Sequence, residues 1–556
     1  MLLTGAQIII ECLKEQGVDV VFGYPGGQII PFYDALYVDG TIRHILPAHE
    51  QGASHAADGY SRSTGRTGVV IATSGPGATN LITGLATAYM DSTPLVAITG
   101  NVPTGLLGRD SFQEVDIVGI SMPISKHNYQ VRDIAKLAPT IREAFAVARS
   151  GRPGPVLIDV PKDMQQGKCE YEPAAPIAFN GNGAPKPEQL EEALSLIAAA
   201  RRPFIYAGGG VVKAGASAEL IELAERIGSP VACSLMGLGS IPGDHPLFTG
   251  MIGMHGTKAS NMGVMNADLL IVLGARFSDR VIGRAESFAA GAQILHVDID
   301  PAEVNKNIRA HHGIIGDIKQ VLAALLTRVE KSEKPQWLSE IATWKLETPE
   351  QSNTPGLKPK HIIERLSAIA PENTIVATDV GQHQMWTAQY FTFRRCGAFL
   401  TSGGLGTMGF GLGAAIGAKV ANPTRPVILV TGDGSFRMNL NEMTTIARYK
   451  LPVVIVLMNN HVLGMVRQWQ TLFFDRHYSQ TNLTEDVDFG KIAAGFGIPA
   501  WKVQSPDDVD RAITWALGCG GPALLEFTID NDEKVLPMVA PGDSIDRLIL
   551  SVDGAE

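Results

Sequence analysis

One segment, residues 425–469, constrains the fold of this chain more than any other. Within it, an apolar run ends in Gly432–Gly434 (GDG), a segment with helical spacing follows at 439–449, and a second apolar run ends in Asn459-Asn460. A strand, a helix and a second strand in this order predict a right-handed βαβ unit with two parallel strands. We therefore expect an α/β fold in which this unit lies inside a parallel sheet.

The same segment predicts a site at the edge of that sheet. Parallel strands bring their carboxyl ends to one edge, so Asp433 and Asn460 are expected side by side. Carboxylate and amide oxygens suit Mg²⁺, which shares its shell with phosphate oxygens, and glycines let the backbone approach a phosphate closely. GDG alone is more often a tight turn. The pair at this spacing favours a site for Mg²⁺ and a diphosphate.

Bulk composition narrows the class of protein. The 556 residues are 45% hydrophobic and 18% charged, which is typical of a globular α/β protein. The formal net charge of −10, without a basic cluster, argues against a nucleic-acid partner. The five cysteines form no CxxC or zinc spacing, and no apolar run reaches the length of a membrane span. We expect a cytoplasmic enzyme with no membrane or nucleic-acid partner.

Strand and helix patterns alternate in three blocks, which predicts three doubly wound parallel-sheet domains in series. Stretches rich in Pro, Gly or charge separate the blocks and are interpreted as linkers, at 168–187 and 330–360. The expected domains are residues 1–165, 188–330 and 361–540, followed by a C-terminal tail, 541–556.

Several strand ends of the first block carry loops that suit a ligand. Residues 23–27 (GYPGG) and 74–80 (SGPGATN) each follow an apolar run, and Glu50 begins a helix rich in small residues. Gly-rich turns occur in any doubly wound fold, so each loop alone is weak evidence. A lone Glu50 is more often a helix-start carboxylate favoured by the helix dipole.

Read together, these motifs identify a family. FGYPGG, HEQGA, SGPGATN, GRPGPV, GARF, GLGTMGFG and GMVRQW occur in this order, and the similarity runs from near the N-terminus to VLPMVAPG at 535–542. The chain resembles the large catalytic subunits of the acetohydroxyacid (acetolactate) synthase family, which are thiamine diphosphate (ThDP) enzymes. The resemblance implies the ThDP-enzyme fold, with an N-terminal domain for the cofactor's pyrimidine, a central FAD-binding-type domain and a C-terminal domain for its diphosphate and Mg²⁺.

The implied reaction is decarboxylation of pyruvate on ThDP and ligation of the resulting hydroxyethyl carbanion to pyruvate or 2-ketobutyrate. The products, 2-acetolactate and 2-aceto-2-hydroxybutyrate, lead to valine, leucine and isoleucine. The implied cofactors are ThDP, Mg²⁺ and FAD. Two neighbouring activities stay open: an FAD-dependent pyruvate oxidase and a catabolic, FAD-independent acetolactate synthase. Family members are homodimers or homotetramers with active sites at the subunit interface, some with a small regulatory subunit.

The resemblance also assigns roles to individual residues. Glu50 corresponds to the carboxylate that bonds to N1′ of the aminopyrimidine, and Met408 to the apolar side chain under the bent cofactor. Arg276 is expected to pair with the acceptor's carboxylate and Trp469 to pack on its extra methyl group. The Mg²⁺ ligands are expected to be Asp433, Asn460 and the backbone carbonyl of Val462.

Further positions match functional positions of the family. Gly27, Gln113 and Lys126 fall near the substrate, and Phe112 and Pro103 in its channel. The other expected ThDP contacts are Pro25, Gly26, Ser74, Gly75, Pro76, Asn80, Gln382, His383, Gly406, Gly432, Gly434, Ser435 and Met465. The expected FAD contacts are Arg152, Gly208, Gly209, Gly210, Met254, His255, Gly256, Gly274, Arg276, Asp298 and Asp317.

Three positions depart from the family's usual sequence. Arg109 stands for Thr, Ser278 stands for the first Asp of GARFDDR, and His461–Leu463 is a variable stretch. None of them removes an expected catalytic group.

Overall fold

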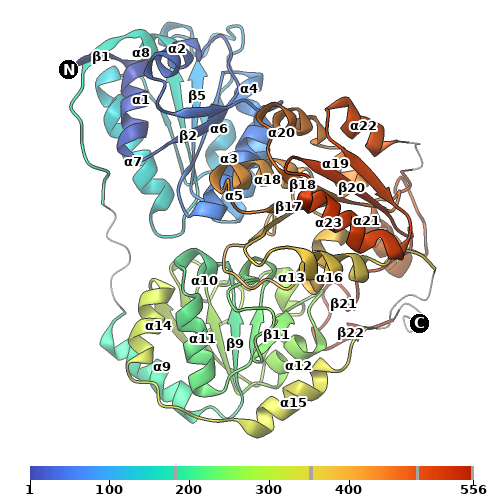
Figure 1. Ribbon diagram of the computed structural model, residues 1–556. Coiled ribbons are helices and arrows are strands. Elements are labelled where there is room, and N and C mark those ends of the chain that lie inside the picture. Colours follow the sequence, from blue (N-terminus) through green and yellow to red (C-terminus); the bar gives the residue numbers. More distant parts are fainter. Residues whose placement is uncertain (179–184, 350–354, 484–486, 552–556) are drawn as a thin grey trace.

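The computed structural model describes residues 1–178, 185–349, 355–483 and 487–551. It contains three domains, each built on a six-stranded parallel sheet between helices, which confirms the predicted α/β architecture (Figure 1). In the part of the chain so described, no helix combines the length and hydropathy that a membrane crossing requires.

The N-terminal domain carries its sheet in the order β3-β2-β4-β5-β7-β6. Its central strands β4 and β5 are mostly apolar and buried along their whole length, as expected for a parallel sheet covered by helices. The strands, in sheet order, are β3 (Arg43–Ile45), β2 (Val20–Gly23), β4 (Gly68–Ala72), β5 (Leu95–Asn101), β7 (Pro155–Pro161) and β6 (His127–Gln130). The helices are α1 (Gly5–Glu15), α2 (Ile30–Asp39), α3 (Glu50–Thr64), α4 (Pro76–Thr79), α5 (Ile82–Met90), α6 (Ile117–Ser121), α7 (Leu137–Arg149) and α8 (Lys162–Gln166), with 3-10 turns η1 (Thr104–Leu106), η2 (Met122–Ile124) and η3 (Ile134–Lys136).

The central domain has a different sheet order, β11-β10-β9-β12-β13-β14. Counted within the domain this is 3-2-1-4-5-6, the order of dinucleotide-binding folds, in which ligands bind where the order reverses, here between β9 and β12. The strands are β11 (Phe248–Met251), β10 (Val231–Cys233), β9 (Pro203–Ala207), β12 (Leu269–Leu273), β13 (Gln293–Asp298) and β14 (His312–Ile315). The helices are α9 (Pro187–Ala199), α10 (Gly209–Ala214), α11 (Ser217–Ile227), α12 (Lys258–Asn266), α13 (Asp279–Ile282), α14 (Ile318–Leu326) and the 3-10 turn η4 (Leu235–Gly237).

The C-terminal domain repeats the strand order of the first, as β16-β15-β17-β18-β20-β19. The order reverses between β15 and β17, so the segment after β17 lies at the place where such sheets bind ligands. The strands are β16 (Phe399–Leu400), β15 (Ile375–Thr378), β17 (Val427–Gly432), β18 (Val453–Asn459), β20 (Ala523–Thr528) and β19 (Ala500–Val503). The helices are α16 (Pro359–Ile369), α17 (Gln382–Tyr390), α18 (Phe410–Ala421), α19 (Asp433–Phe436), α20 (Met443–Tyr449), α21 (Gly464–Phe473), α22 (Phe489–Gly495) and α23 (Val509–Gly518), with 3-10 turns η5 (Leu440–Glu442) and η6 (Pro506–Asp508).

The N- and C-terminal domains are joined through α3 and α18, which cross at very short range (Figure 1). A Cβ at Gly59 would lie 2.2 Å from the carbonyl oxygen of Ala414, and one at Gly417 would lie 1.8 Å from that of Ala56. Only glycine fits at these two contacts. The small-residue pattern of both helices therefore places the two domains against each other.

Three of the expected boundaries are corrected. The stretch 168–187 is not linker throughout, because β8 (Lys168–Glu170) pairs antiparallel with β1 (Leu2–Thr4); its residues 179–184 lie outside the described part. The stretch 330–360 contains α15 (Pro335–Lys345), whose Trp337 is buried in the central domain. The tail contributes β22 (Leu548–Ile549), paired with β21 (Met538–Val539). The helix expected at 439–449 is split into η5 and α20.

Candidate active site

The ends of β17 and β18 bring Asp433 and Asn460 together as expected. Gly432 lies opposite Met458 in the sheet, and the Asp433 carboxylate accepts a hydrogen bond from the backbone N–H of Asn460. Burial raises the pKa of Asp433 to about 6, and its Oδ2 has no hydrogen-bond partner. A buried carboxylate oxygen without a partner is costly, and a divalent cation would satisfy it. These residues fit a Mg²⁺ ion.

Further groups around this edge suit a diphosphate. Gln382 and His383 begin α17, and the amide of Asn460 donates to Gln382 Oε1 (3.2 Å). Burial lowers the pKa of His383 to about 3, so its ring is neutral, and its Nε2 has no partner. The other expected contacts of this domain line the same cavity, namely Gly406, Met408, Gly432, Gly434, Ser435, Met465 and the metal-site residue Val462.

Glu50 lies in a second cluster, in the N-terminal domain. It is the first residue of α3, after His49 as N-cap, and its Oε2 accepts from Asn80 Nδ2 (2.9 Å). Gly75 has φ of +57° and packs against Gln113, where a Cβ would lie 2.9 Å from the Gln113 carbonyl oxygen. The hydroxyl of Ser74 is buried without a partner. Pro25, Gly26, Gly27 and Pro76 belong to the same strand-end loops.

The cavity that contains the Asp433 cluster does not reach the Glu50 cluster of the same chain. This cavity of about 1060 Å³ holds Asp433, Asn460, Met408 and Trp469, but Glu50 and the other expected site residues of residues 23–27 and 74–80 do not line it. Each cluster has unpartnered polar groups, and each is half of the expected site.

The same cavity extends along the central sheet. A Cβ at Gly210 would lie 2.7 Å from Gly274 Cα, so glycines let β9, α10 and β12 approach closely at the switch point. Burial raises the pKa of Asp298 to about 6. Except Gly208 and Gly256, all expected flavin contacts line the cavity: Arg152, Gly209, Gly210, Met254, His255, Gly274, Arg276, Asp298 and Asp317. Its size and lining fit an elongated cofactor.

Arg280, rather than Arg276, is the cation beside Trp469. The Arg280 guanidinium carbon lies 5.6 Å from the centre of the Trp469 ring. Trp469 also packs edge-on against Phe473 and joins the apolar cluster of Met254, Leu536 and Met538. Arg276, four residues earlier, lies near Tyr206 in the central domain. The motif that contains the cation was visible in the sequence, since both arginines belong to GARFSDR.

Lys162, rather than Lys126, is the lysine beside Gly27. Lys162 Nζ donates to the Gly27 carbonyl oxygen (3.0 Å). Lys126 Nζ instead donates to the carbonyl oxygens of Val147 and Ser150 at the end of α7 (2.6 Å each), and burial lowers its pKa to about 8. The structure therefore does not bring Lys126 to the Glu50 cluster. Lys162 directly follows β7, and it belongs to none of the motifs that the sequence made visible.

The expected channel residues lie at the rim of the N-terminal domain. Pro103 precedes the turn η1. The Phe112 side chain is 84% exposed in the single chain, so it is not a core phenylalanine. An aromatic ring left in solvent next to Gln113 is available to a substrate or a second chain.

Comparison with known proteins assigns each domain to one family. Residues 3–120, 190–325 and 379–527 match the models of the N-terminal TPP binding domain, the central domain and the C-terminal TPP binding domain of thiamine pyrophosphate enzymes.

Named relatives span almost the whole chain. A probable acetolactate synthase large subunit of Methanocaldococcus jannaschii is 48% identical over 98% of this chain and 95% of its own length. The acetolactate synthase isozyme 2 large subunit of Escherichia coli is 48% identical over 98% and 99%. An acetolactate synthase of Arthrospira platensis is 46% identical over 99% and 98%. Three domains of matching type, and relatives 46–48% identical over almost the whole chain, lead to one conclusion: the chain belongs to the acetolactate synthase large subunits of the thiamine diphosphate enzyme family.

Proposed function

We propose that this chain, with ThDP and Mg²⁺, removes CO₂ from pyruvate and joins the remaining two-carbon unit to a second 2-keto acid. Pyruvate as acceptor gives 2-acetolactate, and 2-ketobutyrate gives 2-aceto-2-hydroxybutyrate, precursors of the branched-chain amino acids. The observation that carries the proposal is the Asp433–Asn460 pair, which shares its cavity with Trp469 and carries an unpartnered buried oxygen.

ThDP, when bound, supplies the nucleophilic carbon and accepts the electron pair left by CO₂. The protein's own groups hold and protonate it. Asp433, Asn460 and the Val462 carbonyl would hold Mg²⁺ and through it the diphosphate. The Glu50 carboxylate would exchange a proton with a ring nitrogen, a task for which a positioned carboxylate is suited. Met408 would support the bend of the cofactor.

We further propose that two chains share each site. Glu50 and Asp433 belong to separate clusters in one chain, so the Glu50 cluster of one protomer would meet the Asp433 cluster of its partner. A C2 dimer forms two such sites by symmetry. Because the relatives from M. jannaschii and E. coli are named large subunits, a small regulatory subunit is the second proposed partner.

FAD is the cofactor proposed for the central part of the cavity. Arg152, the Gly209–Gly210 turn and the Asp298 and Asp317 strand ends would hold it. Arg152 is poised for this, because its guanidinium bridges Ser92 of its own domain and Glu303 of the central domain (2.8 and 2.7 Å). FAD can accept two electrons, a capacity that the net carboligation does not use.

Product analysis tests the reaction. Purified protein with ThDP, Mg²⁺ and pyruvate is expected to form acetolactate, and added 2-ketobutyrate should divert product to 2-aceto-2-hydroxybutyrate. Products are measured by mass spectrometry in parallel with oxygen and quinone consumption. Acetate or acetyl phosphate with matching consumption of an oxidant would instead identify a pyruvate oxidase. Carboligation by protein purified without flavin would favour the FAD-independent activity.

Arg280 is proposed to bind the acceptor's carboxylate beside Trp469. Replacing Arg280 with Gln is expected to raise KM for the second keto acid about 10- to 100-fold, because a charge-assisted, bidentate contact is lost. Arg284→Gln is the matched control, since it removes the same group from a position that pairs with Asp543 instead, and Arg276→Gln is the comparison within the motif. A larger KM effect from Arg276→Gln would return the role to Arg276.

A further inference from the structure

A buried ionic cluster in the N-terminal domain, two members of which line the same cavity, has been given no role so far. Asp58 and Arg62 lie one turn apart on α3, and Asp91 caps the end of α5. Arg62 pairs with Asp58 through Nε and Nη2 and with Asp91 through Nη2 (3.0 Å). The side chains are 6% exposed for Arg62 and fully buried for both aspartates. Two buried carboxylates thus face one guanidinium.

The second carboxylate is satisfied by another domain. Asp91 accepts from the backbone N–H groups of Gly403 and Gly404, at 3.2 and 2.7 Å. Both belong to the loop of residues 401–409, which joins β16 to α18 and carries Gly406 and Met408. We call it the 401–409 loop. It is the part of the C-terminal domain expected to lie under the bent cofactor.

Other groups of the N-terminal domain hold the same loop. Arg62 Nη1 donates to the carbonyl oxygen of Thr401 (2.7 Å), and its guanidinium lies over the Phe410 ring, 5.1 Å from the centre. The hydroxyls of Thr87 on α5 and Thr407 are 2.7 Å apart and buried. The loop is therefore fixed from α3 and α5 on both sides of Gly403 and Gly404.

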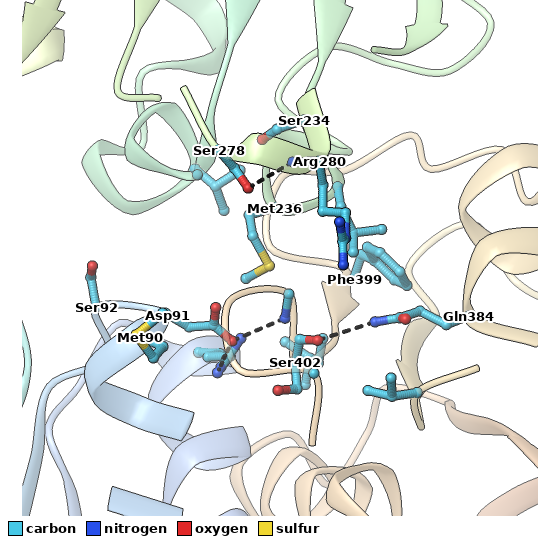
Figure 2. A pocket seen from close by; sticks show the side chains of 18 of the residues that line it. Met90, Asp91, Ser92, Ser234, Met236, Ser278, Arg280, Gln384, Phe399 and Ser402 are labelled. Atoms are coloured by element: carbon cyan, nitrogen blue, oxygen red, sulfur yellow. Dashed lines mark hydrogen bonds and ion pairs between the residues drawn. The ribbon is translucent and has the colours of Figure 1, made fainter. Parts of the chain in front are cut away.

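Three domains meet at these glycines, which leaves the loop little freedom. A Cβ at Gly403 would lie 2.4 Å from Met236 Sδ of the central domain, and one at Gly404 would lie 2.8 Å from Asp91 Oδ1. Figure 2 shows Asp91, Met236 and Ser402, one from each domain, around the same pocket. At Gly404 the backbone can approach Asp91 this closely only because the position lacks a side chain.

Stability alone does not account for this cluster. A buried ion pair is often no more stabilising than apolar residues of the same volume, because both charges lose their hydration. Burial also raises the pKa of Asp58, which marks the cost of its charge. What the carboxylate of Asp91 provides, and an apolar group cannot, is a fixed direction for two adjacent amides.

We propose that Asp91 is a positioning residue for the ThDP site: it anchors the 401–409 loop from the N-terminal domain and thereby holds Met408 in place beneath the cofactor. The proposal rests on the proposed function, since it assigns Met408 to the bound cofactor. Asp91 acts through Gly403 and Gly404.

The first test is Asp91→Asn in the full-length protein. An amide nitrogen in place of one oxygen would face an N–H donor of the loop or of Arg62. The dissociation constant of ThDP, from titration of tryptophan fluorescence in the presence of Mg²⁺, is expected to rise about 10- to 100-fold. The KM for pyruvate at saturating ThDP should stay within about twofold, because the acceptor groups are untouched.

Glu15→Gln is the matched control. Glu15 is a partly buried carboxylate of the same domain that pairs with Arg142 through two hydrogen bonds of 2.8 Å, on the side of α1 and α7 away from the loop (Figure 1). It should lower the melting temperature without changing ThDP affinity. Gly404→Ala disturbs the same contact from the side of the loop. As a single substitution it should weaken ThDP binding. In the double variant with Asp91→Asn it should weaken ThDP binding little further.

Each outcome decides the proposal. If Asp91→Asn binds ThDP as the wild type does and only loses stability, as Glu15→Gln is expected to, Asp91 is merely structural and the proposal is wrong. If Asp91→Asn does not fold, unchanged ThDP affinity in Gly404→Ala overturns it in the same way. Failure of the wild type to form acetolactate would refute the proposed reaction, while the ThDP affinities would still test Asp91.

Discussion

Replacing Glu50 with Gln is expected to lower turnover by about 10²- to 10⁴-fold, the range for loss of a positioned proton-transfer group. Gln has the same shape and can still accept from Asn80, but it cannot exchange a proton with the ring nitrogen of the cofactor. The measurement is kcat for acetolactate formation at saturating ThDP, Mg²⁺ and pyruvate.

The same variant supplies its own fold control. Glu50 is half-buried at the start of α3, and its carboxylate accepts a hydrogen bond from the neutral amide of Asn80, which Gln can also receive. The melting temperature of Glu50→Gln should therefore differ from that of the wild type by only a few degrees. Wild-type turnover in a correctly folded Glu50→Gln would remove Glu50 from the mechanism.

Replacing Asp433 with Asn should separate metal binding from stability. The carboxylate is a proposed Mg²⁺ ligand, and even groups that only support a ligand cost about 10- to 100-fold in metal affinity when they are lost. We expect the Mg²⁺ concentration that gives half-maximal activity to rise at least about 100-fold. Calorimetry should show that ThDP binds more weakly as well.

The metal-free Asp433→Asn protein should be at least as stable as the wild type. Burial raises the pKa of Asp433, which means that the charged carboxylate is disfavoured in the folded chain above that pKa. A neutral amide removes this cost. A melting temperature lowered by many degrees, with Mg²⁺ dependence unchanged, would show that Asp433 serves the fold and not the metal.

Glu50→Gln and Asp433→Asn together test whether each active site is shared between two chains. Co-expression of Glu50→Gln and Asp433→Asn chains would give hybrid dimers in which one of the two sites is fully wild type. Random pairing is expected to restore about a quarter of wild-type activity if each site takes one cluster from each chain. Persistent inactivity of the mixture would place both clusters in one chain's site.

The sequence predicted the fold and the meeting of Asp433 with Asn460, for a physical reason. Apolar runs that end in GDG and NN define both the strands and the edge at which Asp433 and Asn460 meet. The positions of such motifs can be predicted from the sequence because neighbouring parallel strands bring their ends to the same edge of the sheet. The α3–α18 contact was not predicted, since it depends on how two distant small-residue helices fit.

Sequence motifs do not show which of two like side chains reaches a given neighbour. Within GARFSDR, the sequence could not distinguish which arginine reaches Trp469, because the choice depends on the turn into α13. Lys126 and Lys162 likewise flank different ends of the same sheet, and only the structure shows which ammonium lies at Gly27. The Asp91 contact links residues more than 300 positions apart, and no local pattern announces it.

The first and third domains share one strand order, and this has a consequence for how the molecule can change. The repeated order places an equivalent edge, at the point where the strand order reverses, in each of the two domains. Because the two edges belong to different stretches of one chain, a substitution at one edge leaves the other unchanged. Asp433 and Asn460 stand at the edge of the third domain, and Glu50 follows a strand of the first. One strand order can therefore carry two different sets of polar groups in a single molecule.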